Sequence, residues 1–101
     1  MKRWYDPSSI VDNHLHVNQN GHMIRDSARS HGVTDVDMEH ARRNWLVRHD
    51  LSDPQRRPFI LYVGPDTAGR MIEVGVNADG DYVHAMAARR QYLPRTKQRR
   101  R

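Results

Sequence analysis

The residues best suited to chemistry lie near the carboxyl end of the chain, in the order His84, Arg89, Arg90 and Tyr92. A histidine side chain titrates near neutral pH and can donate or accept a proton. A guanidinium suits a phosphate, and a tyrosine ring can stack on a base or donate a proton. RNA cleavage without a metal needs a base near the 2′-hydroxyl, a proton source at the leaving oxygen and positive charge at the phosphate. His84, Arg89 and Tyr92 are therefore candidate catalytic residues.

The same residues also have an interpretation that involves no catalysis. His84 would then be an ordinary exposed strand residue, and Tyr92 would fill the core beneath the end of the chain. A small basic sheet that only holds RNA would contain the same residue types. The residues alone leave both interpretations open.

Three short strands are expected to position these side chains, at about 59–63, 70–77 and 82–87. The Asp79-Gly80 pair between the last two is typical of a two-residue type I′ turn. With that turn as the loop, one face of the hairpin receives only apolar side chains, namely Ile72, Val74, Val76, Val83, Ala85 and Ala87. We expect this face to pack under helices.

The opposite face of the hairpin is expected to carry the histidine. His84 would face Gly75, whose missing side chain leaves open space beside the imidazole. Glu73 is the diagonal neighbour of His84, within reach for a long side chain. We therefore predict that His84 lies on an exposed sheet face. Glu73, a further catalytic candidate, would hold its imidazole in one tautomer.

Two helices are expected before the strands. Residues 24–31 favour a short helix that Gly32 ends. Thr34 is typical of the N-cap of a second helix running to about residue 48, with a polar loop from 50 to 58. The core-facing residues of that second helix would be Met38, Ala41 and Trp45. The prediction is an α+β fold with two N-terminal helices packed on a three- to four-stranded antiparallel sheet.

The chain of 101 residues is long enough for one domain. We expect an N-terminal arm at 1–22, a single α+β domain at 23–93 and a basic tail at 94–101. The absence of cysteine excludes disulfides and thiolate metal sites. No apolar run reaches the roughly 20 residues of a membrane span. The first residues do not resemble a secretory signal, so we expect a cytoplasmic protein with no membrane contact.

The net charge of +5 comes from the end of the chain, because the last 13 residues hold seven of the 17 basic residues and no acid. Such blocks are usually solvated tails, which can still strengthen RNA binding through counterion release. Candidate nucleic-acid contacts are Arg70, Arg90, Arg95, Lys97 and Arg99. Most basic residues are arginine, which suits phosphate recognition but is also what a GC-rich genome produces.

The remaining histidines do not indicate a cofactor. His14, His16 and His22 could project to one side of a strand, but no acid or thiolate spacing completes a tetrahedral metal site. We therefore expect neither a metal nor another cofactor. His31 and His40 could join a second cationic patch, or they could simply line a helix contact.

Most of the chain resembles a group of small actinobacterial proteins that share an LYVGPD…LEVGV…HAMPAR motif. The stretches that carry the resemblance are DSARSHGVTDVDMEHARRN at 26–44, LYVGPDTAGRMIEVGV at 61–76 and VHAMAARRQYL at 83–93. The order of two helices, a three-stranded meander and a basic end is similar to the RelE/ParE-like toxins of bacterial toxin–antitoxin pairs, especially the BrnT-like branch. Trp45 and Ala87 depart from the group, since both stand where its motifs usually have proline.

The resemblance implies a RelE/BrnT-like fold and a toxin that cleaves mRNA or inhibits translation. It also implies an antitoxin protein and RNA as partners, with the ribosome as a further one. Two other functions fit the same residues. One is a non-catalytic nucleic-acid-binding module, in which the basic end only holds phosphates. The other is a ParE-like toxin that acts by binding a protein such as gyrase.

Overall fold

The computed structural model describes residues 16–17, 21, 23–55 and 58–95. The elements in chain order are β1 (His16–Val17), β2 (Met23–Ile24), the 3₁₀ helix η1 (Asp26–Arg29), α1 (Asp35–Arg43), β3 (Val47–Asp50), β4 (Phe59–Pro65), β5 (Met71–Asn77), β6 (Tyr82–Ala87) and the 3₁₀ helix η2 (Arg90–Tyr92). The expected α+β class is confirmed. No helix in these ranges is long and apolar enough to cross a membrane.

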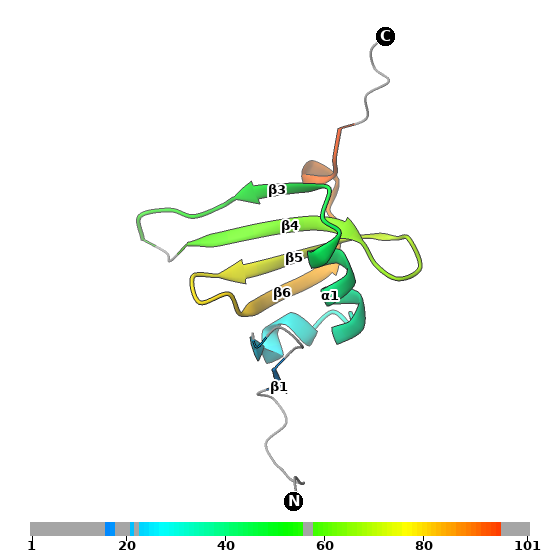
Figure 1. Cartoon of the computed structure of the whole chain (residues 1–101). Helices are drawn as coiled ribbons and strands as arrows, with labels where there is room; N and C mark the ends of the chain where they lie inside the picture. Colours follow the sequence, from blue (N-terminus) through cyan, green and yellow to red (C-terminus); the bar gives the residue numbers. More distant parts are fainter. Residues whose placement is uncertain (1–15, 18–20, 22, 56–57, 96–101) are drawn as a thin grey trace, which may run out of the picture.

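The described strands form one sheet in the order β1-β2-β6-β5-β4-β3 (Figure 1). The β2–β6 pair is parallel, and every other neighbouring pair is antiparallel. The expected antiparallel sheet of three or four strands is therefore wrong in its details. The central meander β4-β5-β6 is extended by β3 on one side and by two short N-terminal strands on the other.

The first expected helix is a single 3₁₀ turn rather than an α-helix. It covers only Asp26–Arg29, and Gly32 follows with a φ of 80°. Two serine hydroxyls bond to carbonyls instead of solvent: Ser30 Oγ donates to the Ser27 carbonyl, and Ser27 Oγ donates to the Val83 carbonyl of β6. Such local side-chain bonds compete with a regular helix. They hold this turn against the sheet.

The second expected helix, α1, begins as predicted but ends early. The Thr34 hydroxyl accepts a hydrogen bond from the Asp37 backbone N–H at 3.1 Å, which confirms the N-cap. The backbone and side-chain N–H groups of Asn44 both donate to the His40 carbonyl, at 3.0 and 2.8 Å. The helix ends at Arg43 rather than near residue 48, and the Leu46 backbone N–H already donates to the Val63 carbonyl of β4 at 2.8 Å. Val47–Asp50, where the sequence predicts the end of the helix and the start of a loop, pairs with β4 instead.

α1 packs on one face of the sheet, where Met38 and Ala41 are fully buried in one core cluster with Val74. Trp45, expected in the core, is 42% exposed because the helix has ended before it. Helix and sheet come closest at Gly64. A β-carbon there would lie 2.6 Å from the Ala41 carbonyl oxygen and 3.0 Å from the Trp45 α-carbon. Glycine is therefore required for this approach.

Substitution of this glycine should destabilise the fold. We expect Gly64→Ala to lower the free energy of unfolding by about 1–3 kcal/mol, because the added methyl group overpacks the helix–sheet contact. Thermal unfolding followed by circular dichroism measures the effect as a lower Tm. Ala68→Ser, in an exposed turn, is the control and should change stability by no more than about 0.5 kcal/mol. An unchanged Tm for Gly64→Ala would contradict the close contact.

The β5–β6 hairpin keeps the expected register except near its turn. The pairs Ile72–Ala87, Glu73–Met86, Val74–Ala85 and Gly75–His84 are confirmed. The loop has three residues, 78–80, rather than two, because the Asn77 carbonyl accepts from Gly80 at 3.0 Å and Gly80 takes a φ of 84°. A bulge then pairs Val76 with Tyr82. Tyr82 rather than Val83 fills the core, and the apolar face expected from the sequence is corrected at that position.

Candidate functional site

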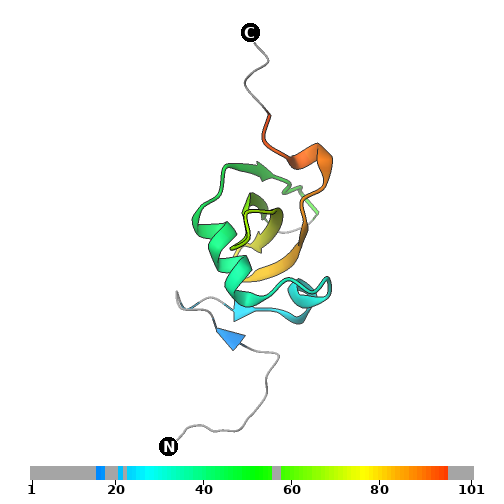
Figure 2. The ribbon, with the colours of Figure 1, turned by 90° about the vertical axis from the view of Figure 1, so that its right-hand side faces the viewer.

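Glu73, Gly75 and His84 lie on the sheet face opposite α1, as alternation along the strands predicts. This face is not open to solvent, in contrast to the expectation. The chain turns back after β6, and η2 lies on the side of the sheet away from α1 (Figure 2). There His49 of β3 donates from Nε2 to the Tyr92 carbonyl at 2.9 Å. Glu73 is fully buried beneath Arg89, and the His84 side chain is only 25% exposed.

The buried Glu73 carboxylate is the centre of this arrangement. His84 Nε2 lies 2.7 Å from its Oε2. Arg89 donates to the same oxygen from Nη2 at 2.6 Å and from Nε at 3.0 Å, and its backbone N–H donates to Oε1 at 2.9 Å. The contact between Glu73 and His84 predicted from the register is confirmed. Arg89, predicted as a catalytic residue that binds the phosphate, also anchors the carboxylate.

These contacts set the protonation of the pair. Burial raises the pKa of Glu73, but the hydrogen bonds from Arg89 and His84 outweigh burial and leave that pKa below its ordinary value. The hydrogen bond between the Arg89 and Glu73 side chains raises the pKa of the Arg89 guanidinium. Because the carboxylate is ionised at neutral pH, the imidazole nitrogen that faces it, His84 Nε2, carries the proton. In the neutral imidazole the other nitrogen, Nδ1, is the acceptor, which is the tautomer of a general base held by a carboxylate.

The space expected beside His84 is filled by Phe59. A β-carbon at Gly75 would lie 2.7 Å from Phe59 Cε1 and 3.0 Å from His84 Cβ. The expectation of an open space next to the imidazole is therefore wrong. The missing side chain at Gly75 makes room for an aromatic ring of the protein rather than for a ligand.

Two histidines that the sequence did not assign to this site lie next to it. The His31 ring, from the loop after η1, is 6.1 Å from the His84 ring between centroids, at an angle of 73°. The His49 ring is 5.1 Å from the ring of Tyr92, and the Arg89 guanidinium carbon is 5.1 Å from the centre of the same Tyr92 ring. The described part of the site is thus a continuous row of imidazole, carboxylate, guanidinium and phenol groups.

The other predicted phosphate ligands lie beside the site, apart from it or outside the described residues. Arg90 begins η2 and Arg95 follows it, and both are exposed. Arg70 pairs with Asp66 at 3.1 Å, with 78% of its side chain exposed. Outside the described residues are Lys97, Arg99, His14, His22 and the side chain of His16.

The helix contact is the better interpretation of His40. Its Nδ1–H donates to the Pro65 carbonyl at 2.8 Å, which ties α1 to the end of β4.

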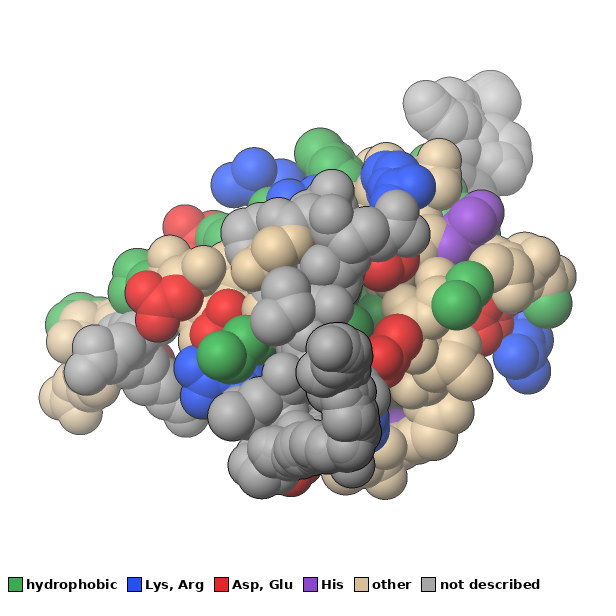
Figure 3. Space-filling view, turned by 60° about the horizontal axis from the view of Figure 1, so that its bottom comes forward, with side chains coloured by type: hydrophobic (Ala, Val, Ile, Leu, Met, Phe, Trp, Pro, Cys, Tyr) green, Lys and Arg blue, Asp and Glu red, His purple; other side chains and the backbone are tan. Residues whose placement is uncertain are grey.

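On the face seen in Figure 3, the coloured side chains include both acids and bases, without a continuous basic surface among the described residues. Across the same described ranges, no three histidine, aspartate or glutamate side chains are placed to hold a metal ion.

Comparisons with known proteins found no relative of this chain. No protein-family model matches the chain, and neither a curated protein nor a solved structure matches it. The relationship to RelE/ParE-like toxins stays a prediction from the sequence motifs. The chemistry of the site must therefore be argued from Glu73, His84, Arg89 and their neighbours.

Proposed function

We propose that the protein is a metal-independent endoribonuclease that acts as the toxin of a type II toxin–antitoxin pair. The observation that carries the proposal is the buried Glu73 carboxylate, which binds an imidazole and a guanidinium together. A carboxylate fixes the tautomer of a histidine base. A guanidinium beside that base supplies positive charge for the crowded phosphate of the transition state.

In the proposed reaction, His84 Nδ1 takes the proton of an RNA 2′-hydroxyl, whose oxygen attacks the adjacent phosphorus. The bond from phosphorus to the 5′ oxygen breaks, and this leaving oxygen takes a proton from His31, the general acid. The products are a 2′,3′-cyclic phosphate and a 5′-hydroxyl end. With their rings 6.1 Å apart, the two histidines are close enough to serve the two oxygens of one phosphodiester.

Arg89 and Tyr92 position the RNA in this proposal. A guanidinium carries five N–H groups, and Arg89 is 44% exposed, so it can hold a phosphate oxygen while bonded to Glu73. Tyr92 offers a ring on which a base can stack. Arg90 and Arg95 add contacts to neighbouring phosphates, and Lys97 and Arg99 strengthen binding through counterion release.

Growth and cleavage assays test the proposal. Expression of the chain alone is expected to arrest a bacterial host and to cut its mRNA, and co-expression of an antitoxin gene adjacent to it should restore growth. The purified chain should cut labelled RNA in the presence of EDTA, or mRNA in a reconstituted translation mixture if the ribosome is a required partner. Such a role places the protein in the cytoplasm of a bacterium.

Two results would contradict the proposed ribonuclease activity, and each would favour another function. A harmless chain that shifts RNA on a gel with strong salt dependence and leaves it intact would be a binding module. Growth arrest with intact RNA and an induced DNA-damage response would indicate a ParE-like toxin that binds gyrase.

A further inference from the structure

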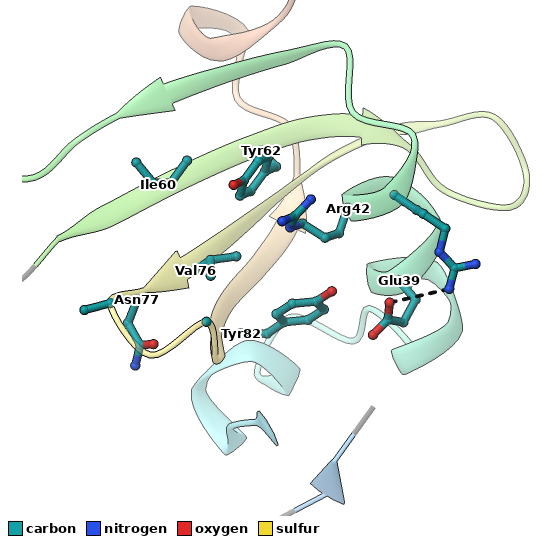
Figure 4. Close-up of a pocket in the computed structure, with 10 residues that line it drawn as sticks. Glu39, Arg42, Ile60, Tyr62, Val76, Asn77 and Tyr82 are labelled. Atoms are coloured by element: carbon teal, nitrogen blue, oxygen red, sulfur yellow. Dashed lines mark ion pairs between the residues drawn. The ribbon is translucent and has the colours of Figure 1, made fainter. Parts of the chain in front are cut away.

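A second site candidate lies on the other face of the sheet, between α1 and the β5–β6 turn. It is a pocket of about 350 Å³ (Figure 4). The helix contributes Glu39, Arg42 and Arg43; the strands contribute Ile60, Tyr62, Val76, Asn77 and Tyr82; and the turn contributes Ala78 and Gly80. Because this face carries neither Glu73 nor His84, the proposed ribonuclease makes no use of the pocket.

The pocket contains a cation above an aromatic ring. The Arg42 guanidinium carbon lies 4.0 Å from the centre of the Tyr62 ring. None of the ion pairs found between described residues involves Arg42. Arg43, in contrast, lies 3.8 Å from the Glu39 carboxylate. Arg42 is therefore the charge in this pocket that is available to an anion.

The remaining walls of the pocket are largely apolar. Ile60 and Val76 are apolar, and the Tyr82 ring is buried. Burial, with the nearby Glu39 carboxylate, raises the pKa of Tyr82 to about 12, so its phenol stays protonated. The Asn77 side-chain oxygen accepts from the Asp79 and Asp81 backbone N–H groups, both at 3.0 Å. In Figure 4 the Asn77 side chain points away from Arg42 and Tyr62, so this residue marks the outer rim of the pocket.

We propose that this pocket binds a small anion built from a planar ring and one phosphate or carboxylate group, such as a nucleoside monophosphate. The volume lies at the lower end of the range for small-molecule sites, roughly 300–1,000 Å³. The ring packs along Ile60 and Val76, while Arg42, which lies over the Tyr62 ring, binds the anionic group. The site is independent of the ribonuclease proposal, so either can fail without the other.

Calorimetric titration of the full chain tests the proposal. The ring-bearing anions are 5′-AMP, phenyl phosphate and phenylacetate, of which the last carries a carboxylate. Adenosine has a ring without the anionic group, and inorganic phosphate has the anionic group without a ring. We expect at least one ring-bearing anion to bind more than about tenfold tighter than adenosine or phosphate, since a charge-assisted hydrogen bond contributes about that factor or more. The relative affinities of phosphate and carboxylate ligands identify the anionic group. Absence of binding by all three ring-bearing anions would overturn the proposal.

Two arginine variants separate the pocket from general attraction of anions. Arg42→Gln should weaken binding of the ring-bearing anion about tenfold or more. Arg48→Gln is the matched control, because Arg48 also lies near the Tyr62 ring, at 5.8 Å, but does not line the pocket. It removes the same charge and should change the affinity less than about twofold. Equal losses in the two variants would overturn the proposal.

Amide chemical shifts of the unsubstituted chain provide a test that does not depend on how a variant folds. Addition of 5′-AMP should move the signals of Arg42, Asn77, Ala78 and Gly80, which line the pocket. If the shifts gather instead at His84 and Arg89, the nucleotide binds at the opposite face and the pocket proposal is wrong.

Discussion

Replacement of His84 by alanine is expected to lower the rate of RNA cleavage by about 10²–10⁴, the range for loss of a general acid or base. The imidazole is held by Glu73 at 2.7 Å with Nδ1 left to accept the proton, so its loss removes the base but few RNA contacts. Single-turnover cleavage of a labelled RNA measures the rate. Filter binding of a non-cleavable 2′-deoxy analogue should give nearly the same affinity for the variant and the unsubstituted chain.

Two further variants make the result specific. His84→Gln keeps an N–H donor for Glu73 but cannot take a proton, so it should fold normally and be as inactive as His84→Ala. His40→Ala removes a histidine that bonds the Pro65 carbonyl on the α1 face, and its rate should stay within about twofold. Full activity of His84→Ala, together with loss of activity in Arg89→Ala, would show that an arginine rather than the histidine drives the reaction.

Replacement of Glu73 by glutamine is expected to have the largest effect on stability. Removal of one partner from a buried ion pair costs about 3–5 kcal/mol, and the 44% exposure of Arg89 places the loss near the lower limit. Chemical denaturation at pH 7 measures the change. Asp50→Asn, at an exposed carboxylate of β3, is the control and should leave the unfolding midpoint nearly unchanged.

The pH dependence gives a second measure of the same carboxylate. The pKa of Glu73 is lower in the folded protein than its ordinary value of 4.5, so ionised Glu73 stabilises the fold at pH values above 4.5. This contribution is lost as the pH falls through the lower folded-state pKa. The unsubstituted chain should therefore lose more stability than Glu73→Gln on acidification from pH 5 to about pH 3. Parallel pH curves for the two proteins would contradict the assigned role of Glu73.

Local patterns were enough to predict the middle of the hairpin and one contact of the site. Strand alternation placed Glu73 and His84 on the same face, because the pairs from Ile72–Ala87 to Gly75–His84 follow a single register. The Thr34 cap was predictable for a similar reason, since its bond partner is only three residues away. The predicted register is wrong next to the turn. There the loop has a third residue and β6 has a bulge, so Tyr82 rather than Val83 lies in the core.

The rest of the site depends on contacts between distant segments. Residues 47–50 lie where the sequence predicts the end of the second helix and the start of a loop, and only their pairing with β4 makes them a strand and brings His49 to Tyr92. His31 reaches His84 because η1 packs against β6. No spacing in the sequence indicates either contact. Burial of Glu73 has the same origin, since Arg89 reaches the carboxylate only after the chain has left β6.

The most direct test of the proposed reaction uses one 2′-deoxy substitution. The position at which the purified chain cuts a labelled RNA is mapped first, with the RNA free or in a translation mixture. The same RNA is then made with 2′-deoxyribose on the 5′ side of that bond. If the 2′-hydroxyl is the nucleophile that His84 activates, cleavage at this position should stop, while other positions should still be cut. The 5′ fragment released from the unsubstituted RNA should end in a 2′,3′-cyclic phosphate. Continued cleavage at the substituted position, which requires water as the nucleophile, would contradict the account.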